Sequence, residues 1–126
     1  MNHIAIIIAA VSSFMLGGLW YSPVLFGKLW LKESGVDPQQ GHPGKIFGLS
    51  FVFCLIAAYG FAWMLGTAPT LEYALTRGAV VGLALVATSF GVNYQFSQRS
   101  TAHLLVDAGY HAVQFVLYGL IFGLWS

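Results

Sequence analysis

Four long stretches of the chain consist almost entirely of apolar residues. They run from about residue 4 to 21, 46 to 65, 73 to 96 and 102 to 125. An α-helix crosses the hydrocarbon core of a bilayer with roughly 20 mostly apolar residues. Backbone N–H and C=O groups in lipid must pair within the protein, and these stretches lack the alternation of a transmembrane β-strand. The sequence therefore predicts an all-α fold, an integral membrane four-helix bundle that forms one domain over residues 1–126.

The low charge content supports this class of fold. Charged residues make up only 7% of the chain and hydrophobic residues 58%, whereas soluble domains carry about 25% charged residues. We therefore expect the lipid bilayer to cover much of the surface. The formal net charge of +1 is too small for a face that neutralises nucleic-acid phosphates, so no nucleic-acid partner is expected.

The segment after the first stretch predicts a short helix at the membrane surface. Ser22 is a residue type that caps helices, and Pro23 suits the first helical position. The residues that follow are apolar apart from two lysines. A helix over about residues 23–32 would therefore lie in the interface, with Trp30 at the level of the lipid headgroups. The alternative is a first span that bends at Pro23 and continues, and we favour the interfacial helix.

Basic residues in the connections predict the orientation, because short cytoplasmic loops are enriched in lysine and arginine. The first and third connections lie on one side of the membrane and carry most of these residues. They hold Lys28, Lys32, Lys45 and Arg99, against Arg77 alone on the other side. The sequence therefore places loops 1 and 3 in the cytoplasm and both termini outside.

Small residues recur every four positions in all four spans. They are Ala9, Ser13 and Gly17 in the first span, Ala58, Ala62 and Gly66 in the second, Gly78 and Gly82 in the third, and Gly119 and Gly123 in the fourth. Small residues at this spacing let helix backbones approach closely, so we expect these faces to pack helices together. Four short spans bury little surface alone, and some of the faces are expected to form a homo-oligomer. The pattern does not separate contacts within a chain from contacts between chains.

The last span carries a polar stripe. His103, Asp107 and His111 recur every four residues, so they lie within about 80° of one another on a helix. The stripe also contains Tyr110, Gln114 and Tyr118. Asp107 is the only acid in a predicted span, and an acid at the centre of a spanning helix costs about 2.5–3.5 kcal/mol on the insertion scale. Such residues face the bundle interior or a cavity and mark candidate functional sites.

The predicted topology brings the polar ends of two other spans to the leaflet that holds Asp107. They are Trp20, Tyr21 and Ser22 after the first span, and Asn93 and Tyr94 near the end of the third. We expect these residues and the polar stripe to line a pocket in the cytoplasmic half. Lys28 and Arg99 belong to the same side and could pair with Asp107.

Three interpretations of the stripe remain open. Asp107 with His103 or His111 could accept a proton, because burial raises the pKa of a carboxyl and imidazole titrates near neutrality. The same three side chains could bind zinc, although one helix alone does not complete a metal site. The stripe could also be a hydrogen-bonded network that holds the helices in register.

Catalysis has no support from sequence motifs. The chain has no phosphate-binding glycine loop, no paired cysteines and no zinc-protease motif. We therefore expect that the protein is not an enzyme and that it has no cofactor and no metal site. The interpretation that we favour is a non-enzymatic structural or accessory membrane protein. The alternative is a small proton-coupled transporter, or a membrane protein that binds an unidentified ion or small molecule, with Asp107 and His111 at its site.

Two segments resemble a known family. GGLWYSPVLFGKLW at residues 17–30 resembles the signature of a family of small bacterial four-span membrane proteins, domain-of-unknown-function family 1761. DAGYH at residues 107–111, with the ending at residues 119–125, resembles the last helix of that family. The resemblance implies a bacterial inner-membrane protein and no particular activity. It also draws residues 20–23 into the neighbourhood of Asp107.

Overall fold

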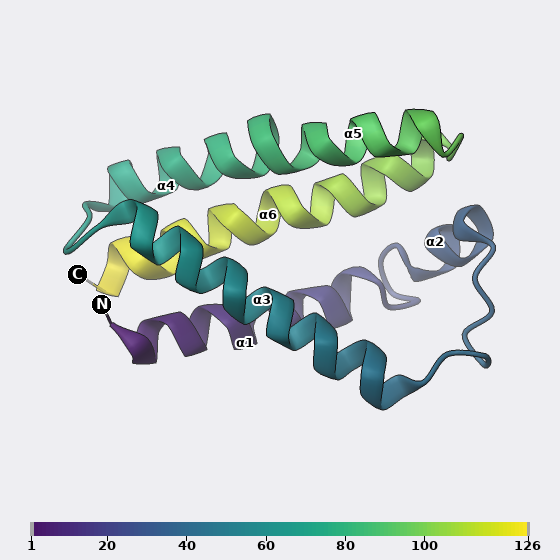
Figure 1. The fold of residues 1–126 in the computed structure, drawn as a ribbon, viewed down its shortest axis with the longest axis horizontal. Helices are drawn as coiled ribbons and strands as arrows, with labels where there is room; N and C mark the ends of the chain where they lie inside the picture. Colours follow the sequence, from purple (N-terminus) through teal and green to yellow (C-terminus); the bar gives the residue numbers. More distant parts are fainter. Residues whose placement is uncertain (1, 126) are drawn as a thin grey trace.

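The computed structural model describes residues 2–125, and every regular element within that range is helical. The helices are α1 (His3–Trp20), α2 (Gly27–Ser34), α3 (Pro43–Leu65), α4 (Leu71–Ala79), α5 (Ala87–Phe96) and α6 (Thr101–Trp125). A π-helical segment, Val80–Val86, joins α4 and α5 into one continuous rod (Figure 1). Four rods, α1, α3, α4–α5 and α6, are long and apolar enough to cross a membrane. The predicted all-α bundle of four spans is therefore confirmed.

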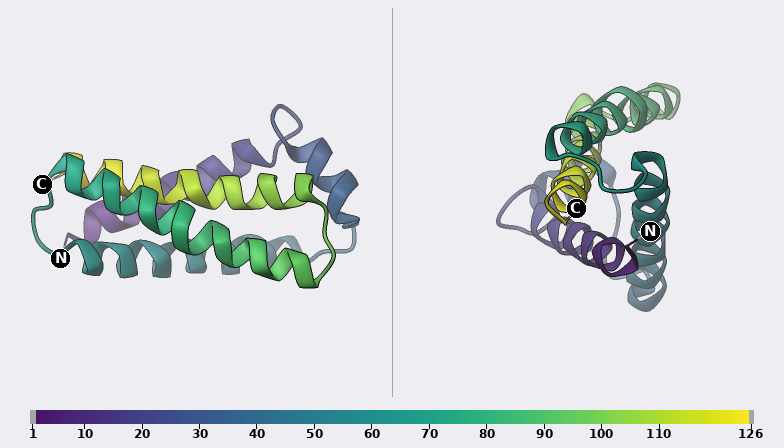
Figure 2. Two further views of the ribbon diagram at one scale, coloured as in Figure 1. Left: turned by 90° about the horizontal axis from the view of Figure 1, so that it is seen from above. Right: turned by 90° about the vertical axis from the view of Figure 1, so that its left-hand side faces the viewer.

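Helix α6 is the centre of the bundle. It packs against α1, α4, α5 and α2, whereas α3 packs chiefly against α1 and meets α6 through side chains such as Phe61. In the end-on view of Figure 2, α3 and the α4–α5 rod lie on different sides of α6 and α1. Of the most apolar window of α6, 44% is buried within the described chain, against 11% for α3 and for the α4–α5 rod. Any site inside this chain must therefore be built around α6.

Glycine sets the closest helix contact, which joins α4 and the π-helical segment to α6. A Cβ on Gly78 would collide with the carbonyl oxygen of Phe115. A Cβ on Gly82 would lie 2.9 Å from the backbone of Ala112, and one on Gly123 would lie 2.7 Å from the backbone of Leu71. These backbones touch because no side chain separates them.

The first span contributes the other small-residue face. Ala9 and Ser13 are fully buried. Gly17 leaves room for an aromatic ring, since a Cβ there would lie 3.4 Å from the Tyr110 hydroxyl. A further glycine, Gly119, faces the Ala74 carbonyl, where a Cβ would also collide. These contacts all lie within one chain.

The surface helix begins later than predicted. The sequence suggested residues 23–32 with Ser22 as the cap, whereas α2 starts at Gly27 and Phe26 occupies the capping position without a side-chain hydrogen bond. Residues 21–26 form a compact turn in which Gly27 N–H donates to the Ser22 carbonyl at 2.9 Å and Phe26 N–H donates to the Trp20 carbonyl at 3.0 Å. A Cβ on Gly27 would collide with the backbone of this turn. Residues 23–26 were predicted to form the first turn of the helix, with Pro23 at its first position, but they belong to this turn instead.

The third span contains an irregularity that the sequence did not predict. In the π-helical segment Val80–Val86, backbone hydrogen bonds reach five residues back, and Ala87 N–H donates to the Gly82 carbonyl. A π turn holds one more residue than an α turn. Two hydroxyls also bond to carbonyls of the segment, Thr88 to Ala84 at 2.8 Å and Ser89 to Leu85 at 2.7 Å. The segment therefore widens the helix while its backbone stays hydrogen-bonded.

The extra residue changes which face of the rod meets α6. A regular α-helix would turn about 160° more than whole turns between Gly78 and Tyr94. One extra residue in the π segment lowers that difference to about 60°. Gly78 and Tyr94 consequently both contact α6, Gly78 at Phe115 and Tyr94 at Asp107.

Candidate functional site

A buried carboxylate receives hydrogen bonds from three separate segments. Asp107 lies on α6 and is 8% exposed. Its Oδ1 accepts a hydrogen bond of 2.6 Å from the Tyr21 hydroxyl, which follows α1. Its Oδ2 accepts from the Tyr94 hydroxyl of α5, and it lies 3.0 Å from Nε2 of His103 on its own helix. Both oxygens of this acid are therefore occupied by donors of the same chain.

Local features of the sequence put these donors in place. Ser100 caps α6, because its Oγ accepts from the backbone N–H of His103 at 3.0 Å. His103 then stands one turn before Asp107, a spacing at which helical side chains meet. The end of α1 is fixed by Trp20, whose Nε1–H donates to the Val106 carbonyl at 2.9 Å. Gly109 makes room for that indole, since a Cβ there would lie 3.2 Å from the ring.

The second half of the polar stripe forms another network, centred on Tyr118. The Tyr118 hydroxyl is fully buried and donates to the Cys54 carbonyl of α3 at 2.9 Å. It accepts from Gln114 Nε2 at 2.9 Å and lies 2.9 Å from Ser13 Oγ of α1. Nearby, the Tyr110 hydroxyl donates to the Ser13 carbonyl at 2.8 Å. One hydroxyl therefore ties α6 to both α1 and α3.

His111 belongs to this second network and does not join Asp107. Its Nδ1 lies 2.7 Å from Gln114 Oε1. Because Gln114 uses its amide nitrogen on Tyr118, its oxygen must accept, and His111 must carry its proton on Nδ1. The imidazole also stacks on Phe90 of α5, with ring centroids 4.8 Å apart. The direction of donation thus runs from His111 through Gln114 and Tyr118 to α3.

Two buried nitrogens close to the carboxylate have no hydrogen-bond partner among the described residues. They are Nδ1 of His103 and Nε1 of Trp30. The two rings meet edge to face, with centroids 6.2 Å apart. Trp30 also meets Tyr21 edge to face at 5.7 Å. The indole of α2 therefore lies against two of the groups that hold Asp107.

The expected partnership of Asp107 with Lys28 or Arg99 is not found. Lys28 is exposed, and the Arg99 guanidinium lies over the Tyr94 ring, 5.6 Å from its centroid. Among residues 2–125, His103 is the one basic side chain within ion-pair distance of the acid.

The zinc interpretation does not fit this arrangement. No three His, Cys, Asp or Glu side chains of the described chain are grouped as metal ligands would be. His103 and Asp107 meet, whereas His111 is directed to Gln114. The stripe supplies two of the three proposed ligands at one place.

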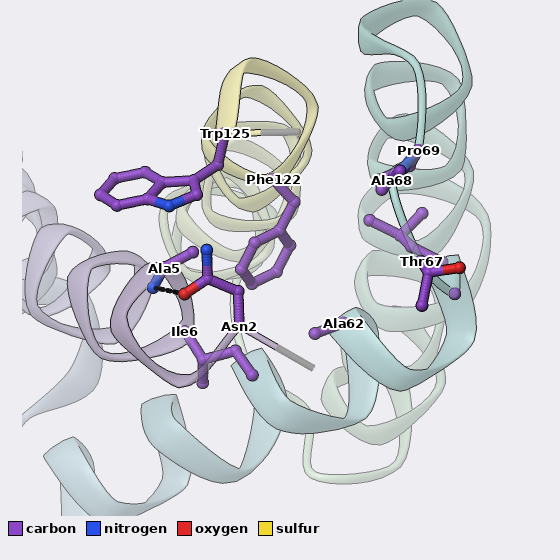
Figure 3. Close-up of a pocket in the computed structure, with 11 residues that line it drawn as sticks. Asn2, Ala5, Ile6, Ala62, Thr67, Ala68, Pro69, Phe122 and Trp125 are labelled. Carbon is purple, nitrogen blue, oxygen red and sulfur yellow. Dashed lines mark hydrogen bonds between the residues drawn. The ribbon is translucent and has the colours of Figure 1, made fainter.

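A cavity lies at the opposite end of the bundle. It has a volume of about 260 Å³ and is lined by the start of α1, the α3–α4 loop and the end of α6. Figure 3 shows Ile6, Ala62, Phe122 and Trp125 around it, with Asn2 at its edge. The Asn2 side chain caps α1 by accepting from Ala5 N–H at 3.1 Å. Among residues 2–125, no acid, lysine, arginine or histidine lines this cavity.

Comparison with known proteins assigns the chain to a family. A model of proteins of unknown function, DUF1761, matches residues 4–123. The chain belongs to the DUF1761 family. No curated protein and no solved structure matches it. The match covers all four spans, and with them both networks of this DUF1761 protein.

Two residues predicted for the pocket of the DUF1761 chain lie elsewhere. The Ser22 hydroxyl donates to the Leu19 carbonyl at 2.7 Å and closes the end of α1. Asn93 is exposed, because its neighbour Tyr94 takes the face that meets α6. The other members divide into two groups. Trp20, Tyr21, Tyr94 and His103 gather at Asp107, whereas Tyr110, His111 and Gln114 form the second network.

Sequence reasoning missed several contributors of this DUF1761 protein. The Cys54 carbonyl, the hydroxyl of Ser13 and the ring of Phe90 all take part in the second network. A backbone acceptor leaves no mark in a sequence, so Cys54 could not have been found. Phe90 does carry a signal, since it continues the four-residue spacing from Gly82 towards Tyr94.

Proposed function

We propose that this protein is a non-enzymatic structural or accessory membrane protein, built as a multi-pass bundle in a bacterial inner membrane. The observation that carries the proposal is that both oxygens of the Asp107 carboxylate have partners, in Tyr21, Tyr94 and His103. A transported solute or a substrate would need an open place at this acid. The acid instead joins the end of α1 to α5 and α6.

The energetics support a structural role for the two networks. Hydrogen bonds between membrane helices average about 0.6 kcal/mol, with a maximum near 1.7. Several such bonds together are comparable with the cost of placing Asp107 in a span, about 2.5–3.5 kcal/mol. They also fix the register of α6 against α1, α3 and α5, because a polar group shifted by one turn would lose its partner.

The proposed orientation puts loops 1 and 3 in the cytoplasm and both termini outside. Four of the five basic residues support it. A homo-oligomer is also part of the proposal. Its support is the low burial of α3 and the α4–α5 rod, with 11% of each window buried. Three glycines of these elements, Gly48, Gly60 and Gly91, would also meet nothing within 4 Å of an added Cβ.

The decisive experiment compares Asp107→Asn with Glu72→Gln, since both variants exchange an acid for its amide. Asparagine offers one acceptor where the carboxylate satisfies three donors. We expect Asp107→Asn to lower the free energy of unfolding by about 1–3 kcal/mol, the cost of buried unpaired polar groups. Glu72 is exposed, and its variant should stay within about 0.5 kcal/mol. Unfolding is followed in mixed micelles at increasing mole fraction of sodium dodecyl sulfate.

One observation favours a second candidate, a proton-coupled transporter or ligand-binding membrane protein. His103 and Asp107 form a titratable pair, and Nδ1 of His103 has no partner among the described residues. His111 is less suited to this role than the sequence suggested, because it bonds to Gln114. Proteoliposomes with an imposed pH gradient distinguish the two candidates. Flux that is lost in His103→Gln and kept in His111→Gln, with both variants folded, would support the transporter.

A further inference from the structure

Helix α2 packs against α6, close to where α6 begins (Figures 1 and 2). Its one aromatic residue, Trp30, is half-buried and packs edge to face against both Tyr21 and His103. Those two residues are partners of Asp107. The indole therefore stands between the carboxylate and the surroundings of α2.

Polar side-chain contacts contribute little to the attachment of α2. Within residues 2–125, no side chain of α2 makes a hydrogen bond or an ion pair with another helix. Trp30 Nε1 and His103 Nδ1 are buried and have no hydrogen-bond partner among the described residues. Ring packing and the backbone hydrogen bonds of the preceding turn hold the helix in place, and water that reached the junction of α2 with α6 would satisfy both nitrogens.

The connections of α2 differ on its two sides. The turn before it is hydrogen-bonded and leaves no space for a side chain at Gly27. The helix ends at Gly35, which has a left-handed φ of +69°, and residues 36–42 are all exposed. An eight-residue helix is marginal without tertiary packing. Such a helix can swing about its tight first turn while the exposed loop follows.

We propose that α2 is a movable cover over the Asp107–His103 pair, with Trp30 as its plug. In the closed position the indole excludes water from the carboxylate. In the open position α2 withdraws, and the pair exchanges protons with the aqueous phase on the α2 side of the bundle.

The test measures how readily Asp107 reacts with a water-soluble carbodiimide and glycine ethyl ester. The full chain is held in lipid nanodiscs, and adducts are quantified on peptides by mass spectrometry. Asp37 and Glu72 are exposed and serve as internal references. Cys54 is buried in the second network and reports opening of the whole bundle through its reaction with a maleimide.

Five variants are compared with the parent chain, and one of them is the milder truncation Trp30→Leu. Trp30→Ala removes the plug, and the ratio of Asp107 to Asp37 labelling should rise severalfold while Cys54 stays unreactive. Trp30→Phe keeps an aromatic ring and should retain the low ratio. Trp63→Ala truncates a tryptophan that is 76% exposed on α3, and it should change nothing. Tyr94→Ala tests the alternative in which water reaches Asp107 from the side of α5.

Three results would overturn the proposal. In the first, Asp107 of Trp30→Ala remains as unreactive as in the parent. In the second, Tyr94→Ala alone raises the labelling. In the third, Cys54 becomes reactive together with Asp107 both in Trp30→Ala and in the milder Trp30→Leu. That last pattern would make Trp30 part of the bundle core, since its loss would unfold the bundle instead of uncovering one site.

Discussion

The Tyr118 hydroxyl of α6 donates a 2.9 Å hydrogen bond to the backbone carbonyl of Cys54 on α3. Helix α3 packs chiefly against α1, and it meets α6 also through the Phe61 ring, which packs on Phe115, Tyr118 and Phe122. The same hydroxyl accepts from Gln114 and meets Ser13 of α1. This phenol is consequently the point where three spans are joined through one oxygen atom.

Replacement of Tyr118 by phenylalanine should therefore loosen the bundle while its packing volume is retained. Gln114 and Ser13 would lose a shared partner, and buried polar groups left unpaired cost about 1–3 kcal/mol each. Because bonds between membrane helices are weaker on average, we expect a loss of about 1–2 kcal/mol in the free energy of unfolding. Tyr73→Phe is the matched control at an exposed position. Equal stability of the two variants would show that the Tyr118 hydroxyl does not hold the three spans together.

A methyl group at Gly78 should separate α4 from α6. Its Cβ would collide with the Phe115 carbonyl, a backbone atom that cannot rotate away. Overpacking of this kind costs about 1–3 kcal/mol. Gly91→Ala, in the same rod, is the control, because nothing lies within 4 Å of its added Cβ. Thermal unfolding in detergent should place Gly78→Ala well below Gly91→Ala, and the reverse order would contradict the close contact.

A second glycine prediction concerns the turn that carries Tyr21. A Cβ at Gly27 would meet the carbonyl of Tyr21 and the backbone of Ser22. Gly27→Ala should displace the turn and weaken the hydrogen bond from Tyr21 to Asp107, with a stability loss of about 1–3 kcal/mol. Gly18→Ala has open space around it and should be tolerated. Exchange of the amide hydrogens at the start of α6 should accelerate in the first variant alone.

Deletion of one residue should be tolerated inside the π-helical segment and harmful after it. Leu83 is 60% exposed, and its removal lets residues 80–86 close as a regular α-helix with the faces before and after unchanged. Val92 is equally exposed, at 61%. Its removal forces either Phe90 or Tyr94 about 100° away from its partner. The thermal midpoints of the two deletion variants are compared. A similar decrease of the midpoint in both would show that the π-helical segment does not determine which face of α5 meets α6.

The sequence predicted the parts of this fold that depend on composition and periodicity. The four spans follow from apolar length, and their bounds agree with the helices to within three residues. The acid at Asp107 was found because a carboxylate in a span is costly and must have partners. The predicted start of α2 was wrong, because the backbone hydrogen bonds of the turn after Trp20 outweighed the capping preference of Ser22.

The details of the site could not be predicted, because they depend on the phase of one helix relative to another. A regular α-helix from Leu71 to Phe96 would not direct both Gly78 and Tyr94 to α6, and nothing local in the sequence marks the extra residue. The division of the stripe has a similar cause. His111 lies one turn from Asp107, yet the ring of Phe90 and the amide of Gln114 hold it in the other network.

The π-helical segment also gives the chain a place where its length can change during evolution without disturbing either network. A relative with one residue fewer between Gly82 and Phe90 would present the same two faces to its last helix. An alignment of the family should then place a single-residue gap within residues 80–86 and no gap between Phe90 and Tyr94. If such sequences were aligned without that gap, the tyrosine that corresponds to Tyr94 would fall in the wrong column of the alignment.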